Sequence, residues 1–242
     1  MRKVALLSTD PTRTSADIRS DTAYSMVKLK LDSVTDGALK VLCLGAHSDD
    51  IEIGCGGTIL RLIEEHPRCT FHWVVFSTLG NRKAEAQRGA ESFVGSKRLE
   101  RTLFQDFKDG FMPFVGSDVK AVFEALKQTV SPDLIFTHNR ADAHQDHRLI
   151  AELTWNTFRD HFILEYEIPK YDGDLGQPNV FVLLESEVCK KKVDLILNAF
   201  ASQRSKRWFE ERTFLSLMRL RGMECNAPSG HAEGFYSRKL VL

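Results

Sequence analysis

The sequence predicts a protein of the α/β class, with a mainly parallel sheet and helices on both of its faces. Short apolar, β-branched runs alternate with longer segments whose apolar residues recur at helical spacing. No internal repeat, low-complexity tract or Pro/Gly/Ser-rich linker divides the 242 residues. We therefore expect a single three-layer, Rossmann-like domain over residues 37–242. It follows a polar lead, residues 1–36, to which the sequence assigns no role.

The first half of this domain is predicted to run strand, helix, strand, helix, strand. Ala38–Leu44 (ALKVLCL) is apolar and β-branched and ends at Gly45, which is typical of a strand buried on both faces. A helix is predicted over Gly54–Glu65, because Ile59, Leu62 and Ile63 share one side of it and Pro67 stops it. The other predicted elements of this half are a strand at Thr70–Ser77, a helix at Lys83–Val94 and a short strand at Leu99–Phe104.

An apolar stripe predicts the helix that opens the second half. Ser117 is its predicted N-cap, and Pro132 breaks the pattern. The residues of the stripe are Val119, Val122, Phe123, Leu126 and Val130. The elements predicted after it are a strand at Asp133–Thr137, a helix through Ala151–Phe158, strands at Phe162–Ile168 and Val180–Leu184, and helices at Ser186–Phe200 and Phe209–Arg221, the last ending at Gly222.

Composition disfavours several classes of protein. The 33 basic and 33 acidic side chains cancel, so no long-range field favours a nucleic-acid partner. No apolar run approaches the roughly 20 residues of a membrane span, and the N-terminus lacks the apolar core of a signal peptide. The 5 cysteines are odd in number and contain no C-x-x-C pair, so a disulfide framework is not expected. We expect a cytoplasmic protein that has no nucleic-acid partner and no membrane span.

Ligands of open parallel sheets bind outside the carboxyl ends of the strands. One polar cluster follows the first predicted strand: His47, Asp49, Asp50 and Glu52 lie within six residues. Adjacent aspartates repel each other unless a cation compensates their charge. His47 and Asp50 are three residues apart, so one turn can aim both at a single point with Asp49 beside it. The alternative is that the two aspartates merely cap the following helix.

A second polar cluster follows the predicted strand Asp133–Thr137. It contains Asp142, His144, Asp146 and His147, with the two histidines again three residues apart. A solvated polar loop is the alternative interpretation. Both clusters fall at the same predicted edge of the sheet, so His47, Asp50 and one or both of His144 and His147 can share one ion. Imidazole and carboxylate ligands suit zinc, with Fe²⁺ or Co²⁺ as possible substitutes, and a catalytic zinc site keeps one position open for water.

These two motifs resemble the PIG-L/LmbE family of metal-dependent N-deacetylases. The resemblance lies in H-S-D-D-I-E-I-G-C-G-G-T at His47–Thr58 and in P-D-L-I-F-T followed by D-A-H-Q-D-H within Pro132–His147. Weaker matches extend it over about residues 38–236: Arg82-x-x-Glu85 with Gly95, Tyr166-Glu167, Ser202-Gln203 and Ala232-Glu233-Gly234-Phe235. One departure is Ser48, where the family often has proline.

The resemblance implies roles for the matching residues. His47, Asp50 and His147 correspond to zinc ligands, Asp49 to the general base and His144 to the residue that stabilises the tetrahedral intermediate. Asp146 corresponds to a partner that orients or charges a histidine. The implied reaction removes an acetyl group from an N-acetylated amino sugar or sugar conjugate, giving a free amine and acetate. The resemblance also allows a homo-oligomer, although no symmetry follows from the sequence.

The sequence predicts the substrate-binding residues less clearly than the metal ligands. Arginines near the predicted mouth can hold hydroxyl or phosphate groups through forked hydrogen bonds, and two late polar residues can close the pocket. For most of them, a solvated surface position is the competing interpretation. The candidates are Arg82, Arg140, Arg148, His231 and Glu233, together with His138 as a residue lining the pocket.

Two other functions stay open. A phosphoesterase with the same residue types would commonly hold two ions, and no third His/Asp cluster for a second ion is evident in the sequence. A carbohydrate-binding relative without turnover is expected to have lost one of His47, Asp49, Asp50, His144 and His147, yet all are present.

Overall fold

The computed structural model of the protein describes residues 26, 28, 31 and 38–241. All the elements below belong to the unit Asp32–Leu242. The predicted lead over residues 1–36 lies mostly outside the described residues, so this division of the chain stays a prediction. Within the described part, no helix is long and apolar enough to cross a bilayer.

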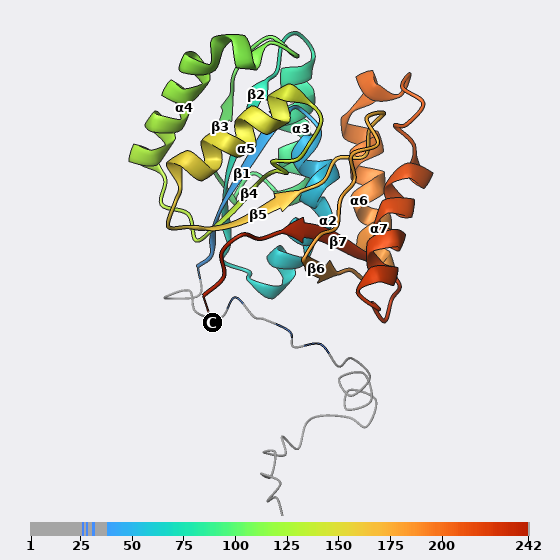
Figure 1. Ribbon diagram of the computed structural model, residues 1–242. Coiled ribbons are helices and arrows are strands. Elements are labelled where there is room, and N and C mark those ends of the chain that lie inside the picture. Colours follow the sequence, from blue (N-terminus) through green and yellow to red (C-terminus); the bar gives the residue numbers. More distant parts are fainter. Residues whose placement is uncertain (1–25, 27, 29–30, 32–37, 242) are drawn as a thin grey trace, which may run out of the picture. The chain divides into compact units, whose positions relative to one another are not determined.

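One seven-stranded sheet has the order β3-β2-β1-β4-β5-β7-β6 (Figure 1). The neighbours from β3 to β5 pair in parallel, and β7 is antiparallel to both β5 and β6. The sheet is therefore mainly parallel, as predicted. The strands are β1 Lys40–His47, β2 Thr70–Ser77, β3 Leu99–Phe104, β4 Leu134–His138, β5 Phe162–Tyr166, β6 Val180–Leu183 and β7 Ala232–Tyr236.

Helices cover both faces of the sheet (Figure 1), which confirms the predicted three-layer α/β class. The helices α4 (Gly116–Thr129) and α5 (Gln145–Thr157) lie on one face. The other face carries α2 Asp50–Glu65, α3 Arg82–Val94, α6 Ser186–Ala199 and α7 Glu211–Glu224. Two short 3₁₀ helices, η2 Met112–Val115 and η3 Ala201–Gln203, lie in connections.

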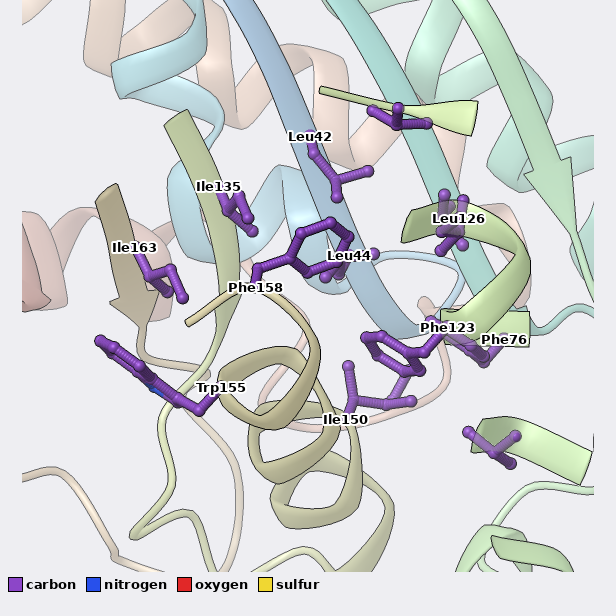
Figure 2. Packing of buried hydrophobic residues seen from close by; sticks show 14 of the residues in the cluster. Leu42, Leu44, Phe76, Phe123, Leu126, Ile135, Ile150, Trp155, Phe158 and Ile163 are labelled. Carbon is purple, nitrogen blue, oxygen red and sulfur yellow. The ribbon is translucent and has the colours of Figure 1, made fainter. Parts of the chain in front are cut away.

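The predicted stripe of α4 forms much of the core beneath α4 and α5 (Figure 2). Phe123 of α4 stacks on Phe76 of β2 with ring centroids 5.2 Å apart, and Ile150 of α5 joins the same cluster. The strands contribute alternating apolar side chains such as Leu42 and Leu44. Burying one such side chain contributes about 1.5–3 kcal/mol, so this core holds α5, and the polar residues at its start, firmly against the sheet.

The start of α2 differs from the prediction and matters for the site. The helix begins at Asp50 instead of Gly54, so Asp50 and Glu52 lie in its first turn. Glycine weakens a helix, but packing overrides this preference here. A Cβ atom at Gly54 would lie 2.1 Å from the Tyr166 ring, and one at Gly56 would lie 2.5 Å from the Phe93 ring. These glycines permit close helix packing and do not mark a helix start.

Other predicted boundaries are corrected in the same way. The helix predicted through Ala151–Phe158 begins at Gln145 and so includes His147. Ser117 does not cap α4, which begins at Gly116 after η2. The last helix runs through Gly222, where a Cβ atom would lie 2.2 Å from the carbonyl oxygen of Gly230. The strand β7 was not predicted, since its short AEGFY segment pairs only with distant parts of the chain. The strands predicted at Thr70–Ser77 and Leu99–Phe104 have these same bounds in the structure, and the remaining ends move by at most three residues.

Candidate metal centre

The two predicted polar clusters meet at the carboxyl ends of neighbouring parallel strands. His47 is the last residue of β1, and Asp50 begins α2 directly after it. His147 lies in the first turn of α5, which follows β4, the neighbour of β1 in the sheet. As a result, Nδ1 of His47 lies 3.1 Å from Nε2 of His147, although 100 residues separate them in the chain.

Three side-chain atoms at this point fit the geometry of one tetrahedral zinc ion. Nδ1 of His47 lies 3.3 Å from Oδ2 of Asp50 and 3.1 Å from Nε2 of His147, and the latter two atoms are 3.6 Å apart. Zinc bonds of about 2.0–2.1 Å at tetrahedral angles place neighbouring ligand atoms about 3.3 Å apart. The donors His47, Asp50 and His147 therefore fit the ion that the sequence predicts, with three protein ligands.

His138 also lies close to this point, where its Nε2 is 3.1 Å from Oδ2 of Asp50. Nε2 of His138 accepts a hydrogen bond of 2.9 Å from the backbone N–H of Ala46, at the end of the ladder between β1 and β4. The ring is fully buried and stacks on His147 with centroids 3.9 Å apart. His138, predicted to line the pocket, instead supports the ring of His147 and the exit of β1.

Carboxylates lie beside the other ring nitrogens of both ligand histidines, and the contact to His147 is a hydrogen bond. Nδ1 of His147 lies 2.9 Å from Oδ2 of Asp142. Nε2 of His47 lies 3.0 Å from Oδ1 of Asp109 and 3.4 Å from Oδ2 of Asp146. Such carboxylate–histidine–metal arrangements fix the ring orientation and raise ligand basicity. Sequence reasoning found Asp142 and Asp146 but missed Asp109.

Asp146 also binds the backbone of the loop between β3 and α4. Its buried carboxylate accepts the backbone N–H groups of Gly110, at 2.7 Å, and Met112, at 3.1 Å. These bonds hold the connection between β3 and α4, which carries Asp109, against the start of α5. Asp146 therefore faces His47 and this loop, and it contributes to positioning the site.

His144 caps α5 and lies beside both ligand histidines. Its Nδ1 accepts a hydrogen bond from the backbone N–H of Asp146, so in the neutral ring the proton sits on Nε2. The ring centroid is 4.9 Å from that of His47 and 4.6 Å from that of His147. Burial, followed by the charges of His147 and His47, lowers the pKa of His144 below its ordinary value. The side chain therefore offers a neutral N–H donor.

Asp49 is held by an arginine and does not act as a side-chain cap. It occupies the N-cap position of α2, but its side chain makes no capping hydrogen bond. Oδ1 of Asp49 lies 2.5 Å from Nη2 of Arg82, whose Nη1 donates to Glu85 at 3.0 Å and to Ser202 at 3.1 Å. The neighbouring Asp50 accepts the backbone N–H of His47 at 2.6 Å. Arg82 thus fixes the carboxylate of Asp49, and the N–H of His47 fixes Oδ2 of Asp50, which is one of the three donor atoms.

The surrounding charges favour a cation at this position. Burial alone would lower the pKa of His47, but the carboxylates of Asp50, Asp109 and Asp146 outweigh it and raise this pKa well above its ordinary value. Burial would raise the pKa of Asp50, yet the neighbouring histidines, His147 first, hold it well below its usual range. A group of anionic oxygens around imidazole nitrogens is stabilised by positive charge, whether a proton or a metal ion supplies it.

A second grouping of possible ligands overlaps the first. His47, Asp109, His144 and Asp146 also have ligand atoms within 4.8 Å of one another, as do Asp50, His138 and His147. Sequence reasoning found no further cluster, because Asp109 lies outside both motifs. Each of these groups shares a histidine with the His47–Asp50–His147 triangle, so none of them is an independent site.

The predicted substrate-binding residues are dispersed. Arg82 lies at the site but is bound to Asp49, Glu85 and Ser202, and Arg148 donates to the backbone carbonyls of Asp142 and Ala143. Arg140 is exposed at the loop after β4, with its backbone N–H bonded to Glu165. Arg82 and Arg148 thus lie beside site residues, whereas the backbone of Arg140 is bound to Glu165 of β5.

The late candidate His231 lines a groove of about 500 Å³ together with residues of α7, and Glu233 lies in β7. Glu233 is buried, and its carboxylate accepts the N–H groups of Gly57, at 2.8 Å, and Thr58, at 2.6 Å, as well as Lys192 Nζ at 2.7 Å. Glu233 therefore secures α2 and α6 against β7, and both of its carboxylate oxygens accept hydrogen bonds from these helices.

Lys170 is a further residue that sequence reasoning missed. Its Nζ lies 3.0 Å from Oδ2 of Asp142, the oxygen that faces His147. Asp174 accepts both Lys170 and the backbone N–H of Ala143. Both residues lie in the loop after β5, and Asp109 lies in the loop after β3. The rule that strand ends border the site could have found all three, but none carries a recognisable motif.

Comparison with known proteins agrees with this site. Residues 42–158 match the family model described as PIG-L, GlcNAc-PI de-N-acetylase. A protein of Escherichia coli (strain K12), described as the uncharacterized deacetylase YaiS, is 29% identical over 160 residues, which cover 57% of this chain and 83% of that protein.

Solved structures share the fold. The conserved protein TT1542 from Thermus thermophilus has a TM-score of 0.68 at 22% identity, covering 84% of this chain and 96% of that one. The N,N'-diacetylchitobiose deacetylase from Pyrococcus horikoshii has a TM-score of 0.64 at 19% identity, covering 93% of both chains. The 4-carboxy-2-hydroxymuconate hydratase GalB from Pseudomonas putida KT2440 scores 0.64 at 18% identity, covering 84% of this chain and 98% of its own, so this fold alone does not determine the reaction.

The match over residues 42–158 contains every residue of the His47–Asp50–His147 triangle and its neighbours Asp49, His144 and Asp146. The part of the chain that carries this site therefore matches the PIG-L family.

Proposed function

We propose that the protein is a zinc-dependent N-deacetylase that hydrolyses the acetamido group of an amino sugar or sugar conjugate. The observation that carries the proposal is the triangle of His47, Asp50 and His147, with the ring of His144 beside it and Asp49 next to Asp50 in the chain. The deacetylase names of the Escherichia coli relative and of the Pyrococcus horikoshii structure support the same reaction class. The reaction breaks the C–N bond of the amide and yields a free amine and acetate.

His47, Asp50 and His147 would hold the ion, and Fe²⁺ or Co²⁺ would suit the same donors. When bound, zinc lowers the pKa of a coordinated water from about 15.7 to about 7 and polarises the amide carbonyl. Asp142 keeps the imidazole of His147 oriented through a hydrogen bond, and Asp109 places a carboxylate beside Nε2 of His47.

Asp49 takes the proton of the attacking water in this proposal. Its carboxylate is buried at the N-cap of α2, next to the ligand Asp50, and Arg82 fixes its orientation through Oδ1. A positioned general base of this kind contributes about 10²–10⁴-fold to the rate. The same proton then becomes available to the departing nitrogen, which leaves as an amine.

His144 donates a hydrogen bond from Nε2 to the amide oxygen as negative charge develops there. The capping bond to Nδ1 holds the ring in the tautomer that this role requires. One donor to a developing oxyanion is worth about 2.7–4 kcal/mol, or roughly 10²–10³-fold in rate. Asp146, whose backbone N–H makes the capping bond, positions His144 through that contact.

The phosphoesterase alternative is disfavoured by the shared histidines. Two-metal phosphoesterases hold their ions about 3.5–4 Å apart in adjoining ligand sets. Here the possible second group, with Asp109 and Asp146, reuses His47. The other alternative is a sugar-binding relative without turnover. Such a protein would have no use for Asp49 and His144, which are not metal ligands, yet both residues are present at the site.

The proposal is tested by measuring acetate release from a panel of N-acetylated sugars. The purified protein is first loaded with one equivalent of zinc. We expect release from at least one sugar class, with the free amine appearing in equal amount. His66→Ala serves as a matched control, because His66 follows the opposite end of α2. Failure of the zinc-loaded protein to release acetate from any member of the panel would reject the deacetylase assignment.

The cytoplasmic location and a homo-oligomer stay predictions from the sequence.

A further inference from the structure

A lysine from the loop after β5 reaches the carboxylate that orients one of the ligand histidines. Nζ of Lys170 lies 3.0 Å from Oδ2 of Asp142, and the same oxygen lies 2.9 Å from Nδ1 of His147. The side chain of Lys170 is 10% exposed and that of Asp142 is 2% exposed. The ammonium group and the imidazole therefore share one buried carboxylate oxygen.

The Asp142 carboxylate has contacts besides the one with Lys170. Its Oδ1 accepts the backbone N–H of His144 at 2.8 Å, and its Oδ2 forms the hydrogen bond with His147. Burial alone would raise the pKa of Asp142, but the hydrogen bond with His147 and the neighbouring positive charges, Lys170 among them, hold it well below its usual range. Asp142 is thus a carboxylate that keeps two of these contacts when the charge of Lys170 is removed.

The loop that carries Lys170 is closed at its base by one buried ion pair. Nη2 of Arg221 lies 2.7 Å from Oε1 of Glu167, where the loop begins. The same Nη2 donates to the carbonyl oxygen of Gly176 at 3.0 Å, and the N–H of Gly176 donates to Glu167 at 3.2 Å. Both ends of the segment 168–175 are therefore fixed. Lys170 is held beside Asp142 by a closed loop, and this reduces the entropy that its contact costs.

Asp174, on the same loop, offsets part of the lysine charge. It accepts a hydrogen bond from Nζ of Lys170, and its Oδ2 also accepts the N–H of Ala143 at 2.6 Å. The side chain of Asp174 is 13% exposed, so water screens its charge more than that of Asp142. Two carboxylates and one ammonium group thus lie behind His147, and the ammonium group cancels one of the two negative charges.

The position of this ammonium group acts against metal binding. A carboxylate behind a ligand imidazole raises the basicity of that ligand and strengthens its bond to the metal. A cation on the same carboxylate oxygen competes with the imidazole for this negative charge. It also repels a metal cation across a buried region where charges are poorly screened. Both effects of Lys170 have the same sign, and both lower the affinity of the site for a divalent ion.

From this arrangement we infer that Lys170 is a positioning residue that acts on the metal ion through Asp142 and His147. By sharing the Asp142 carboxylate, it limits the charge that His147 donates. The ion is then held less tightly, and it keeps more of its positive charge for polarising the amide carbonyl. The inference rests on the proposed function, which supplies the ion and the amide.

The test compares zinc affinity in the full chain and in Lys170→Gln, measured by competition with a chromophoric chelator. Glutamine is neutral but can still donate a hydrogen bond to Asp142. We expect Lys170→Gln to bind zinc about tenfold more tightly. On the zinc-loaded variant, kcat for acetate release should nevertheless fall several-fold with little change in KM. Lys170→Arg keeps the charge and should retain both original values. Lys190→Met, at an exposed lysine of α6, is the control.

Asp174→Asn tests the same charge in the opposite direction while Lys170 stays in place. The amide oxygen can still accept the N–H of Ala143, but it no longer offsets the lysine charge. Zinc affinity should therefore fall several-fold in Asp174→Asn. Asp172→Asn, at an exposed aspartate of the same loop, is the matched control and should leave the affinity unchanged. This pair of variants provides the answer if Lys170→Gln folds poorly.

A loss of structural support and a loss of charge give opposite results in Lys170→Gln. Unchanged or weaker zinc binding in the folded variant, or a kcat equal to or above the original, would overturn the inference. An unchanged affinity in Asp174→Asn would overturn it as well. The chelator measurement does not depend on turnover, so these affinity results leave the deacetylase function intact. Expected affinities without acetate release by the zinc-loaded original protein would reject the deacetylase function instead, and absence of zinc binding by that protein would overturn both.

Discussion

Nδ1 of His147 and Oδ2 of Asp142 lie 2.9 Å apart, which leaves Nε2 of the same imidazole facing His47 and Asp50. Asp142 in turn contacts Lys170 at 3.0 Å. The imidazole of His147 is therefore oriented by the carboxylate of Asp142, which Lys170 in turn holds in place. Nδ1 of this ring contacts Asp142, and Nε2 is left to bind the metal ion.

This relationship predicts that Asp142→Asn weakens zinc binding while the fold persists. An amide cannot supply the charge that raises the basicity of His147, so we expect zinc affinity to fall about 10–100-fold. Competition with a chromophoric chelator measures the change. Asp118→Asn, at an exposed aspartate in the first turn of α4, is the control. An unchanged zinc affinity in Asp142→Asn would show that Asp142 does not support the metal ligand.

Asp49→Asn should separate metal binding from catalysis. The amide keeps the size of the side chain but cannot accept the proton of water, so kcat should fall by about 10²–10⁴-fold with zinc still bound. Zinc content and acetate release are measured on the same preparation. Near-complete activity in zinc-loaded Asp49→Asn would mean that another group is the base.

Glu233→Gln tests the structural role that replaces its predicted place in substrate binding. The substitution leaves Lys192 buried without its carboxylate partner at 2.7 Å, and breaking such a pair costs about 3–5 kcal/mol. Urea denaturation should therefore give a markedly lower free energy of unfolding. A variant of normal stability with a raised KM would instead return Glu233 to the substrate site.

The contacts of Glu85 predict a pH-dependent loss of stability. Burial raises the pKa of this carboxyl, but hydrogen bonds from Ser202 and the charge of Arg82 lower it below the ordinary value overall. The unfolded chain therefore takes up a proton before the folded one does, so stability falls as the pH drops below about 4.3. The free energy of unfolding between pH 5 and pH 3 should fall less steeply in Glu85→Gln. Glu91→Gln, at an exposed position of α3, should retain the original slope; equal slopes in all three proteins would contradict the assignment.

The sequence predicted the convergence of His47 with His147 because it depends on a general property of parallel sheets. Both residues follow apolar strands, and neighbouring parallel strands end at one edge. The apolar stripe of α4 could be predicted for a similar reason, because apolar residues at helical spacing indicate a buried helix face.

Features that depend on contacts between residues far apart in the chain could not be predicted from the sequence. Glu233 bonds to Thr58 and Gly57, which lie 175 and 176 residues away, and nothing local distinguishes such a residue from a pocket residue. The glycines of α2 look like a helix start by propensity, but the Tyr166 and Phe93 rings require them inside the helix. Asp109 approaches His47 only because its loop is bound to Asp146.

The central claim is that one divalent ion is held by His47, Asp50 and His147, and zinc stoichiometry in matched histidine variants tests it most directly. After loading and dialysis, metal analysis should find one zinc per chain in the original protein and in His144→Ala and His66→Ala. His47→Ala and His147→Ala should retain almost none. Full zinc retention in His47→Ala or His147→Ala, two ions per chain, or no zinc in the original protein would contradict it.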